Sequence, residues 1–164
     1  MSLDYLPEHV ENALLALQLA AKEADHLDYT YRTLYAQRID LAWVEQLAER
    51  QDLTEKIDAF VSRFARLQDH IGEKLLPRFA AMLGEAPKSV LDVLASAERA
   101  GWVDNAEVFI GARKLRNLLV HEGMSDAQSF LEALLSAKGA TEMLFEIIRR
   151  VTSEAVRLGI TPPG

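Results

Sequence analysis

The stretch from Arg113 to Gly123 places several polar side chains beside a strongly apolar run. Within this stretch, Arg116 and His121 have the side chains best suited to take part in a reaction. A histidine titrates near neutral pH, so it can accept a proton and also donate one. An arginine stays cationic and can hold a phosphate through two parallel hydrogen bonds. The two residue types are therefore suited to acid–base chemistry at a phosphate group.

The spacing of Arg116 and His121 limits how the two side chains can act together. On a helix with about 100° per residue, Leu115, Leu118 and Leu119 fall in one apolar arc. The polar side chains fall on the opposite side: Arg113, Arg116, Asn117 and His121. Arg116 and His121 lie roughly 140° apart around the axis, so they diverge on a straight helix. They can meet at one substrate if the helix ends there or if a second copy of the chain supplies half of the site.

A structural role accounts for the same residues equally well. Gly123 suits the end of a helix, which puts His121 in the last turn. Basic side chains near a helix C-terminus interact favourably with the helix dipole, and Arg113, Lys114 and Arg116 all precede this end. From the spacing alone, the structural role and the chemical role both stay open.

The composition of the whole chain favours a single helical domain, residues 1–164. Apolar residues make up 49% of the chain, and Gly and Pro are sparse, which is typical of helical proteins. There is no cysteine, so the chain has no disulfide framework and no thiolate metal site. The formal net charge of -7 disfavours non-specific binding to nucleic acid, so any nucleic-acid role needs a local basic patch.

The apolar runs of the chain are short. None approaches the roughly 20 residues that a membrane-spanning helix needs. The N-terminus opens with Asp4 and Glu8 and lacks the basic-then-apolar pattern of a signal peptide. We therefore expect a cytoplasmic protein that does not associate with membranes.

Apolar residues recur at helical spacing along most of the chain, and no strand or hairpin signal appears. The pattern predicts an all-α, up-and-down bundle of about five to six helices. Helices are expected from residue 7 onward, with residues 28–33 left open, and over 41–50, 52–84, 89–101, 104–123 and 125–159. Pro77 predicts a kink in the long third helix. Trp43 and Trp102 are expected in the core or at the bundle ends.

Capping pairs mark the expected helix starts. A cap followed three residues later by an acidic or amide side chain is a typical N-terminal signal. The pairs are Asp52 with Glu55, Ser89 with Asp92, Asp104 with Glu107, and Ser125 with Gln128.

Most kinds of chemical site lack support in this sequence. There is no Gly-rich phosphate loop, no His-Glu-x-x-His pair and no Gly-x-Ser-x-Gly turn. His70 follows Asp69, but the spacing for a second strong metal ligand is missing, and a polar helix face is the simpler interpretation. The sequence therefore predicts neither a metal nor a cofactor.

A resemblance to a known family favours the chemical role of Arg113–Gly123 over the structural one. Residues 116–121, Arg-Asn-Leu-Leu-Val-His, resemble the Arg-x4–6-His motif of the HEPN superfamily. Residues 60–77 are similar to the long helix of HepT-like members, and residues 97–102 resemble their next turn. The resemblance spans about residues 55–125.

The resemblance implies a fold, an activity and partners. HEPN domains are helical bundles that pair as homodimers with their motif helices facing each other. Many are metal-independent endoribonucleases, and HepT-like members are toxins whose antitoxins are MNT-type nucleotidyltransferases. By this resemblance Arg116 and His121 are catalytic, and Asn117 and Asp69 support them. Arg113 and Lys114 from both copies would form a basic cleft for RNA.

One position departs from the family pattern. HepT-like members often carry a tyrosine two residues after the histidine, where the antitoxin attaches AMP, and this chain has Gly123. The resemblance therefore does not imply that this chain is regulated by AMP transfer. Two alternatives stay open: a non-catalytic binding subunit of a nucleotidyltransferase, and a structural dimer in which Arg116 caps a helix or pairs with Asp69.

Overall fold

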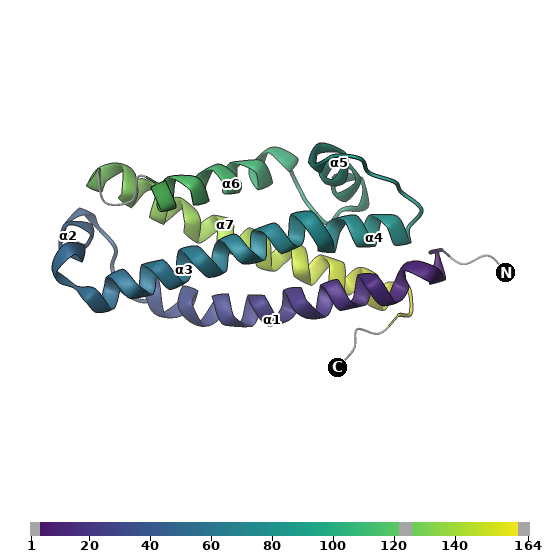
Figure 1. The fold of residues 1–164 in the computed structure, drawn as a ribbon, viewed down its shortest axis with the longest axis horizontal. Helices are drawn as coiled ribbons and strands as arrows, with labels where there is room; N and C mark the ends of the chain where they lie inside the picture. The colour runs from purple at the N-terminus through teal and green to yellow at the C-terminus, as the bar shows by residue number, and fades with distance from the viewer. Residues whose placement is uncertain (1–3, 122–125, 161–164) are drawn as a thin grey trace.

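Four helical rods run up and down along the length of the molecule (Figure 1). This computed structural model describes residues 4–121 and 126–160, with only the backbone of His121, and it contains no strand in that part of the chain. The predicted all-α bundle is confirmed. The rods, in chain order, are α1 (Val10–Leu34), the continuous stretch α3 (Gln51–His70), η3 (Ile71–Leu75) and α4 (Leu76–Met82), then α6 (Ala106–His121) and α7 (Ala127–Arg157).

Short helices close the two ends of the bundle (Figure 1). At one end lie α2 (Leu41–Glu45) and the 3-10 turn η2 (Leu47–Glu49), and at the other lie α5 (Val90–Ala100) and the 3-10 turn η1 (Pro7–His9). Trp43 of α2 and Trp102, just after α5, are 8% and 2% exposed, as predicted. Bulky side chains thus seal both ends of the core.

The segment left open in the first helix continues as helix to Leu34. Two tyrosines near its end pack against α7. The Tyr31 ring meets Phe145 edge-on at 6.0 Å, and the Tyr35 hydroxyl donates to the carbonyl of Leu134. These contacts with α7 compensate for the weak apolar stripe in residues 28–33.

The long third helix contains a π-helical turn just before Pro77, where a kink was predicted. Its backbone widens into the π-helical turn η3 and returns to α-helix at Leu76. A proline has no N–H to donate and clashes with the carbonyl four residues earlier. Insertion of a π-helical turn is one way for a helix to continue past such a position, and the rod here continues through α4.

The capping predictions were partly right. Ser89 accepts a hydrogen bond from the Asp92 amide at 3.1 Å and opens α5. The Asp52 and Asp104 caps were wrong, because α3 begins at Gln51, α6 begins at Ala106, and both carboxylates instead pair with arginines. Asn105 is the side chain that caps the start of α6, accepting from the Glu107 amide at 2.8 Å.

The last helix begins with a different cap from the one predicted. Asp126 accepts hydrogen bonds from the amides of Gln128 and Ser129 and opens α7. Ser125, the predicted cap, lies outside the described residues. α7 then runs unbroken through Gly139 to Arg157.

One hydrophobic core runs through the bundle and joins all four rods. Its largest fully buried side chains are Phe60, Phe64, Phe79, Phe109, Leu27, Leu34, Leu47, Leu67, Ile71, Leu75, Leu76 and Met82. On α5, Val93, Leu94 and Ala97 face the core, whereas Val90 and Leu91 are 40% and 65% exposed. None of the described helices is long and apolar enough to cross a membrane.

Candidate functional site

Helix α6, which carries the predicted site, packs against α3 and α7 through a narrow face. Phe109, Ala112 and Leu119 are at most 5% exposed and form this face. The Phe109 ring lies over η3, so close that a methyl group on Gly72 would be 3.4 Å from it. This packing fixes the rotation of α6 about its own axis.

Arg116 lies on the same side of α6 as this buried face. It follows Ala112 by one helical turn and precedes Leu119 by almost another. Its guanidinium forms an ion pair with the carboxylate of Asp69 on α3, and the two side chains are 27% and 35% exposed. The prediction that Arg116 points away from the packed side was wrong, because Asp69 supplies a partner for its charge at the edge of the core.

The predicted apolar arc of α6 was also partly wrong. Leu119 is buried and Leu115 is partly buried, but Leu118 is 43% exposed. Because Arg116 occupies the side that faces α3, the buried face is rotated away from Leu118. Val120 is 57% exposed, so two apolar side chains near the end of this helix face solvent.

The other predicted site residues line the outer side of α6. Asn117 and Lys114 are exposed, and Arg113 is half-buried. Arg113, Asn117 and His121 follow one another at intervals of one turn, so they climb one face of the helix. The described part of α6 extends to His121, and the side chain of His121 and the predicted helix end at Gly123 lie outside the described residues.

Three consecutive residues at the end of α3 tie it to both neighbouring helices. Gln68 donates through Nε2 to the carbonyl of Phe109 on α6 at 3.2 Å, and Asp69 pairs with Arg116 on the same helix. His70 bonds through Nε2 to the carbonyl of Ala16 on α1 at 2.8 Å. A polar layer thus crosses the bundle immediately before the π-helical turn.

His70 corrects the interpretation of the sequence. It was expected on a solvated polar face, but it is only 7% exposed. A carbonyl oxygen only accepts hydrogen bonds, so the proton must be on Nε2 of His70. The signal for its burial was its position three residues after Leu67 and next to Ile71, both of which belong to the apolar stripe of α3 and η3.

We expect the Arg116–Asp69 pair to be a measurable part of the stability. Arg116→Ala and Asp69→Ala should each lower the free energy of unfolding by about 1–3 kcal/mol, because each leaves a partly buried charge without its partner. The double variant should lose clearly less than the sum of the two. Denaturant unfolding of the four proteins measures this difference.

Arg113→Ala is the matched control for that cycle. Arg113 lies on the same helix and forms no ion pair with any described residue. Its removal should change the unfolding free energy by no more than about 0.5 kcal/mol. Strictly additive losses for Arg116 and Asp69 would show that the pair is not formed in solution.

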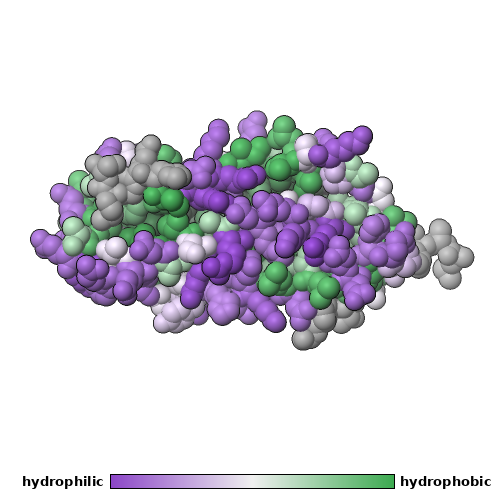
Figure 2. All heavy atoms as spheres, viewed as in Figure 1, coloured by the Kyte–Doolittle hydropathy of each residue, from purple (hydrophilic) through white to green (hydrophobic). Residues whose placement is uncertain are grey.

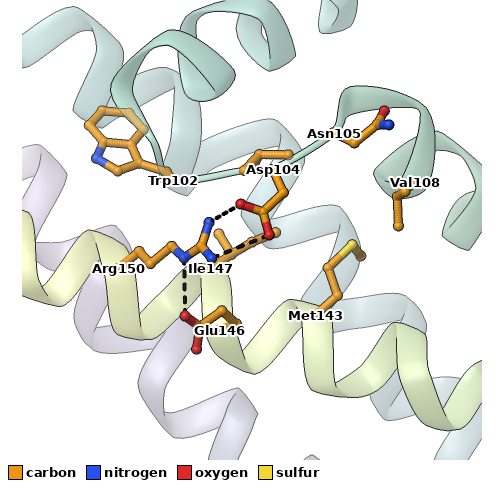
Figure 3. Close-up of a pocket in the computed structure, with 9 residues that line it drawn as sticks. Trp102, Asp104, Asn105, Val108, Met143, Glu146, Ile147 and Arg150 are labelled. Atoms are coloured by element: carbon orange, nitrogen blue, oxygen red, sulfur yellow. Dashed lines mark hydrogen bonds and ion pairs between the residues drawn. The ribbon is translucent and has the colours of Figure 1, made fainter.

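A hollow of about 250 Å³ lies between the start of α6 and α7 (Figure 3). Arg150 of α7 spans its wall, donating to Asp104 at 2.7 Å and to Glu146 at 3.0 Å. Val108 and Met143 supply apolar walls. Since the guanidinium is already shared between two carboxylates, this cluster fastens the α5–α6 connection to α7 rather than offering a charge to a ligand.

Glu146 keeps its negative charge to low pH. Hydrogen bonds from Arg149 and Arg150 lower its pKa from 4.5 to about 2. A carboxyl group with a lowered pKa in the folded state stabilises the fold above its unfolded pKa, and this contribution is lost as the pH falls through the folded value. We expect Glu146→Gln to lower the melting temperature near neutral pH, by an amount that shrinks to nothing between pH 4.5 and about 2.

Melting temperatures recorded across that pH range test this expectation. Glu55→Gln is the control, since Glu55 is exposed and forms no ion pair within the described ranges. Its melting temperature should follow that of the parent protein at every pH. A Glu146→Gln deficit that stays constant down to the lowest pH would show that charge pairing is not its cause.

Neither the described side chains nor comparison with known proteins gives further evidence on the function of this site. Within residues 4–120 and 126–160, no three His, Cys, Asp or Glu side chains gather closely enough to hold a metal ion. Comparison of the chain with protein-family models, curated proteins and solved structures gave no match.

Proposed function

We propose that this protein is a HepT-like HEPN endoribonuclease that cleaves RNA without a metal ion. The observation that carries the proposal is the position of Arg116. It belongs to the Arg-Asn-x3-His string, it lies on the helix that ends with His121, and Asp69 fixes its orientation. A guanidinium has five N–H donors, so pairing with one carboxylate leaves donors for a phosphate. Asp69 thus acts as a positioning residue.

The proposed chemistry uses the nucleophile that RNA carries itself. A base removes the proton from a 2′-hydroxyl, whose oxygen attacks the adjacent phosphorus and forms a 2′,3′-cyclic phosphate. The bond to the 5′-oxygen breaks, and an acid gives that oxygen a proton. His121 fits both proton transfers, since imidazole titrates near neutral pH. Arg116 stabilises the negative charge that gathers on the phosphate oxygens.

A homodimer completes this proposed site. One histidine cannot act as base and acid in the same step, so two copies of α6 facing each other would supply both. The exposed apolar side chains of Leu118 and Val120 give this helix a surface that a second copy can cover. Arg113 and Lys114 from two chains would gather positive charge locally, which a protein of net charge -7 needs in order to bind RNA.

The proposed physiological setting is a cytoplasmic toxin neutralised by an MNT-type nucleotidyltransferase. Gly123 stands where related toxins carry the tyrosine that receives AMP. A glycine has no hydroxyl group to modify. We therefore propose neutralisation by binding, or modification of another residue, in place of AMP transfer to this position.

A non-catalytic binding subunit of a nucleotidyltransferase is the second candidate. The pairing of Arg116 with Asp69 favours it, because part of the arginine charge is already compensated. Gly123 favours it as well. In this role the chain would hold its partner enzyme and would leave RNA intact.

The two candidates differ in a direct assay. The endoribonuclease should degrade RNA in the presence of EDTA as the free protein. The binding subunit should show no such activity and should form a stable complex with a small nucleotidyltransferase encoded beside it. Stable complex formation together with intact RNA would replace the first candidate by the second.

A further inference from the structure

A groove on the other side of α3 collects positive charge. It has a volume of about 280 Å³ and lies between α1 and the η3–α4 segment. Its lining includes three cationic side chains: Lys22 from α1, Lys74 from η3 and Arg78 from α4. None of the three forms an ion pair with a described carboxylate. No Asp or Glu lines the groove, although acidic residues outnumber basic ones in the chain, 25 to 18.

Neutral and apolar groups complete the lining. Leu15 and Leu19 of α1 are 51% and 43% exposed at the groove, and Gln18 adds an amide. On the face shown in Figure 2, a small apolar patch over α1 borders strongly hydrophilic side chains. The groove therefore combines charge for an anion with an apolar surface for an attached organic group.

His70 supplies a buried polar group at the groove. Its Nε2 is committed as a donor to the carbonyl of Ala16 at 2.8 Å. Its other nitrogen, Nδ1, forms no hydrogen bond with any described residue. His70 is only 7% exposed and lines the groove, so the lone pair on Nδ1 remains to accept a hydrogen bond from a donor group on a ligand. The π-helical turn that carries Lys74 is a deformation often found at functional sites.

We propose that this groove binds a phosphate monoester, with the phosphate held by Lys74 and Arg78, which lie four residues apart, and the organic group resting on Leu15 and Leu19. Arg78 also donates to the carbonyl of Asn12 at 3.3 Å, which leaves its other N–H groups for the phosphate. Lysine and arginine are the side chains that proteins use for phosphate. The volume of about 280 Å³ lies just below the roughly 300 Å³ at which ligand sites typically begin, so the ligand must be small. Burial raises the pKa of Glu23 overall, whereas the charges of His70, Arg66 and Lys74 lower it, so this carboxylate lies near two of the groove residues without lining the groove itself.

The organic group has two possible sources, a soluble ester or a lipid headgroup. Both ligands would present a phosphate attached to an apolar organic group. Phenyl phosphate is a suitable soluble probe, and inorganic phosphate shows what the anion contributes alone. Vesicles containing phosphatidic acid test the lipid source against vesicles of phosphatidylcholine.

Titration calorimetry and the imidazole ¹⁵N signals of His70 report on this site. Phenyl phosphate should bind saturably, more tightly than inorganic phosphate, and should shift the His70 signals. Lys74→Gln and Arg78→Gln should each weaken binding about tenfold or more, the ratio expected when one charge-assisted hydrogen bond of about 1.4 kcal/mol is lost. Lys74→Arg should retain binding.

Two further variants test whether binding depends on the residues of the groove. Lys138→Gln, an exposed lysine on α7, should leave binding unchanged. Leu19→Ala should weaken phenyl phosphate but not inorganic phosphate. Recruitment to phosphatidic acid vesicles that depends on Lys74 would identify a lipid source, and its absence a soluble one. No saturable binding of phenyl phosphate, or binding that Lys74→Gln and Arg78→Gln leave intact, would overturn the proposal.

Discussion

Replacing His121 with alanine is expected to abolish RNA cleavage. In the proposed mechanism this side chain accepts the proton of the 2′-hydroxyl and its partner copy protonates the leaving oxygen. General acid–base catalysis typically contributes about 10²–10⁴-fold to a rate, and this variant removes both transfers. The measurement is the initial rate of cleavage of a labelled RNA in the presence of EDTA. The unfolding free energy should change little, since His121 is the last residue of α6.

His26→Ala is the matched control for this experiment. His26 is exposed on α1, away from α6, and its loss should leave the cleavage rate unchanged. Equal activity of the His121 variant and the parent protein would remove His121 from the mechanism. Equal loss in the His121 and His26 variants would show that the loss is not specific to His121.

Replacing Phe109 with alanine is expected to cause the largest loss of stability on α6. Phe109 is 1% exposed, its ring fills the space over η3 beside Gly72, and its carbonyl receives the hydrogen bond from Gln68. Truncation of a buried phenylalanine costs about 3–5 kcal/mol, because the lost contacts leave a cavity. The free energy of unfolding in denaturant measures the loss.

Val108→Ala provides the comparison for that variant. Val108 precedes Phe109 on the same helix and is 53% exposed, so its truncation should cost no more than about 0.5 kcal/mol. If both variants cost the same small amount, α6 would not be docked on η3 through Phe109, and the position assigned to Arg116 would fail with it.

The periodic pattern of apolar residues was sufficient to predict the architecture. The long stripe from Leu53 to Leu83 identified the central rod, and Pro77 located its deformation to within one turn. Helix starts were less predictable, because the same carboxylate can cap a helix or pair with an arginine. Asp104 pairs with Arg150, a residue far away in the sequence, and this tertiary contact leaves the capping role to Asn105.

The sequence named Arg116 and Asp69 but did not predict the geometry that joins them across α3 and α6. The side of α6 that faces the core was mispredicted because three leucines suggested one arc, whereas Phe109, Ala112 and Leu119 set the actual face. Sequence periodicity cannot reveal that a charged residue belongs at the edge of a core when its partner lies on another helix.

The pairing of Arg116 with Asp69 changes which experiment separates function from structure. A loss of stability on removal of Arg116 follows from the ion pair whether or not the arginine touches RNA. Only activity distinguishes the two roles. Arg116→Lys keeps a positive charge near Asp69 but loses the planar fork for phosphate, so cleavage should fall further than stability.

The most direct test of the central claim compares RNA with DNA of the same sequence in the presence of EDTA. If the 2′-hydroxyl is the nucleophile, the free protein will cleave the RNA and release 2′,3′-cyclic phosphate ends, while the DNA stays intact. An RNA that survives this incubation unchanged, or a DNA that is cut as fast as the RNA, would contradict a metal-independent endoribonuclease acting through the 2′-hydroxyl.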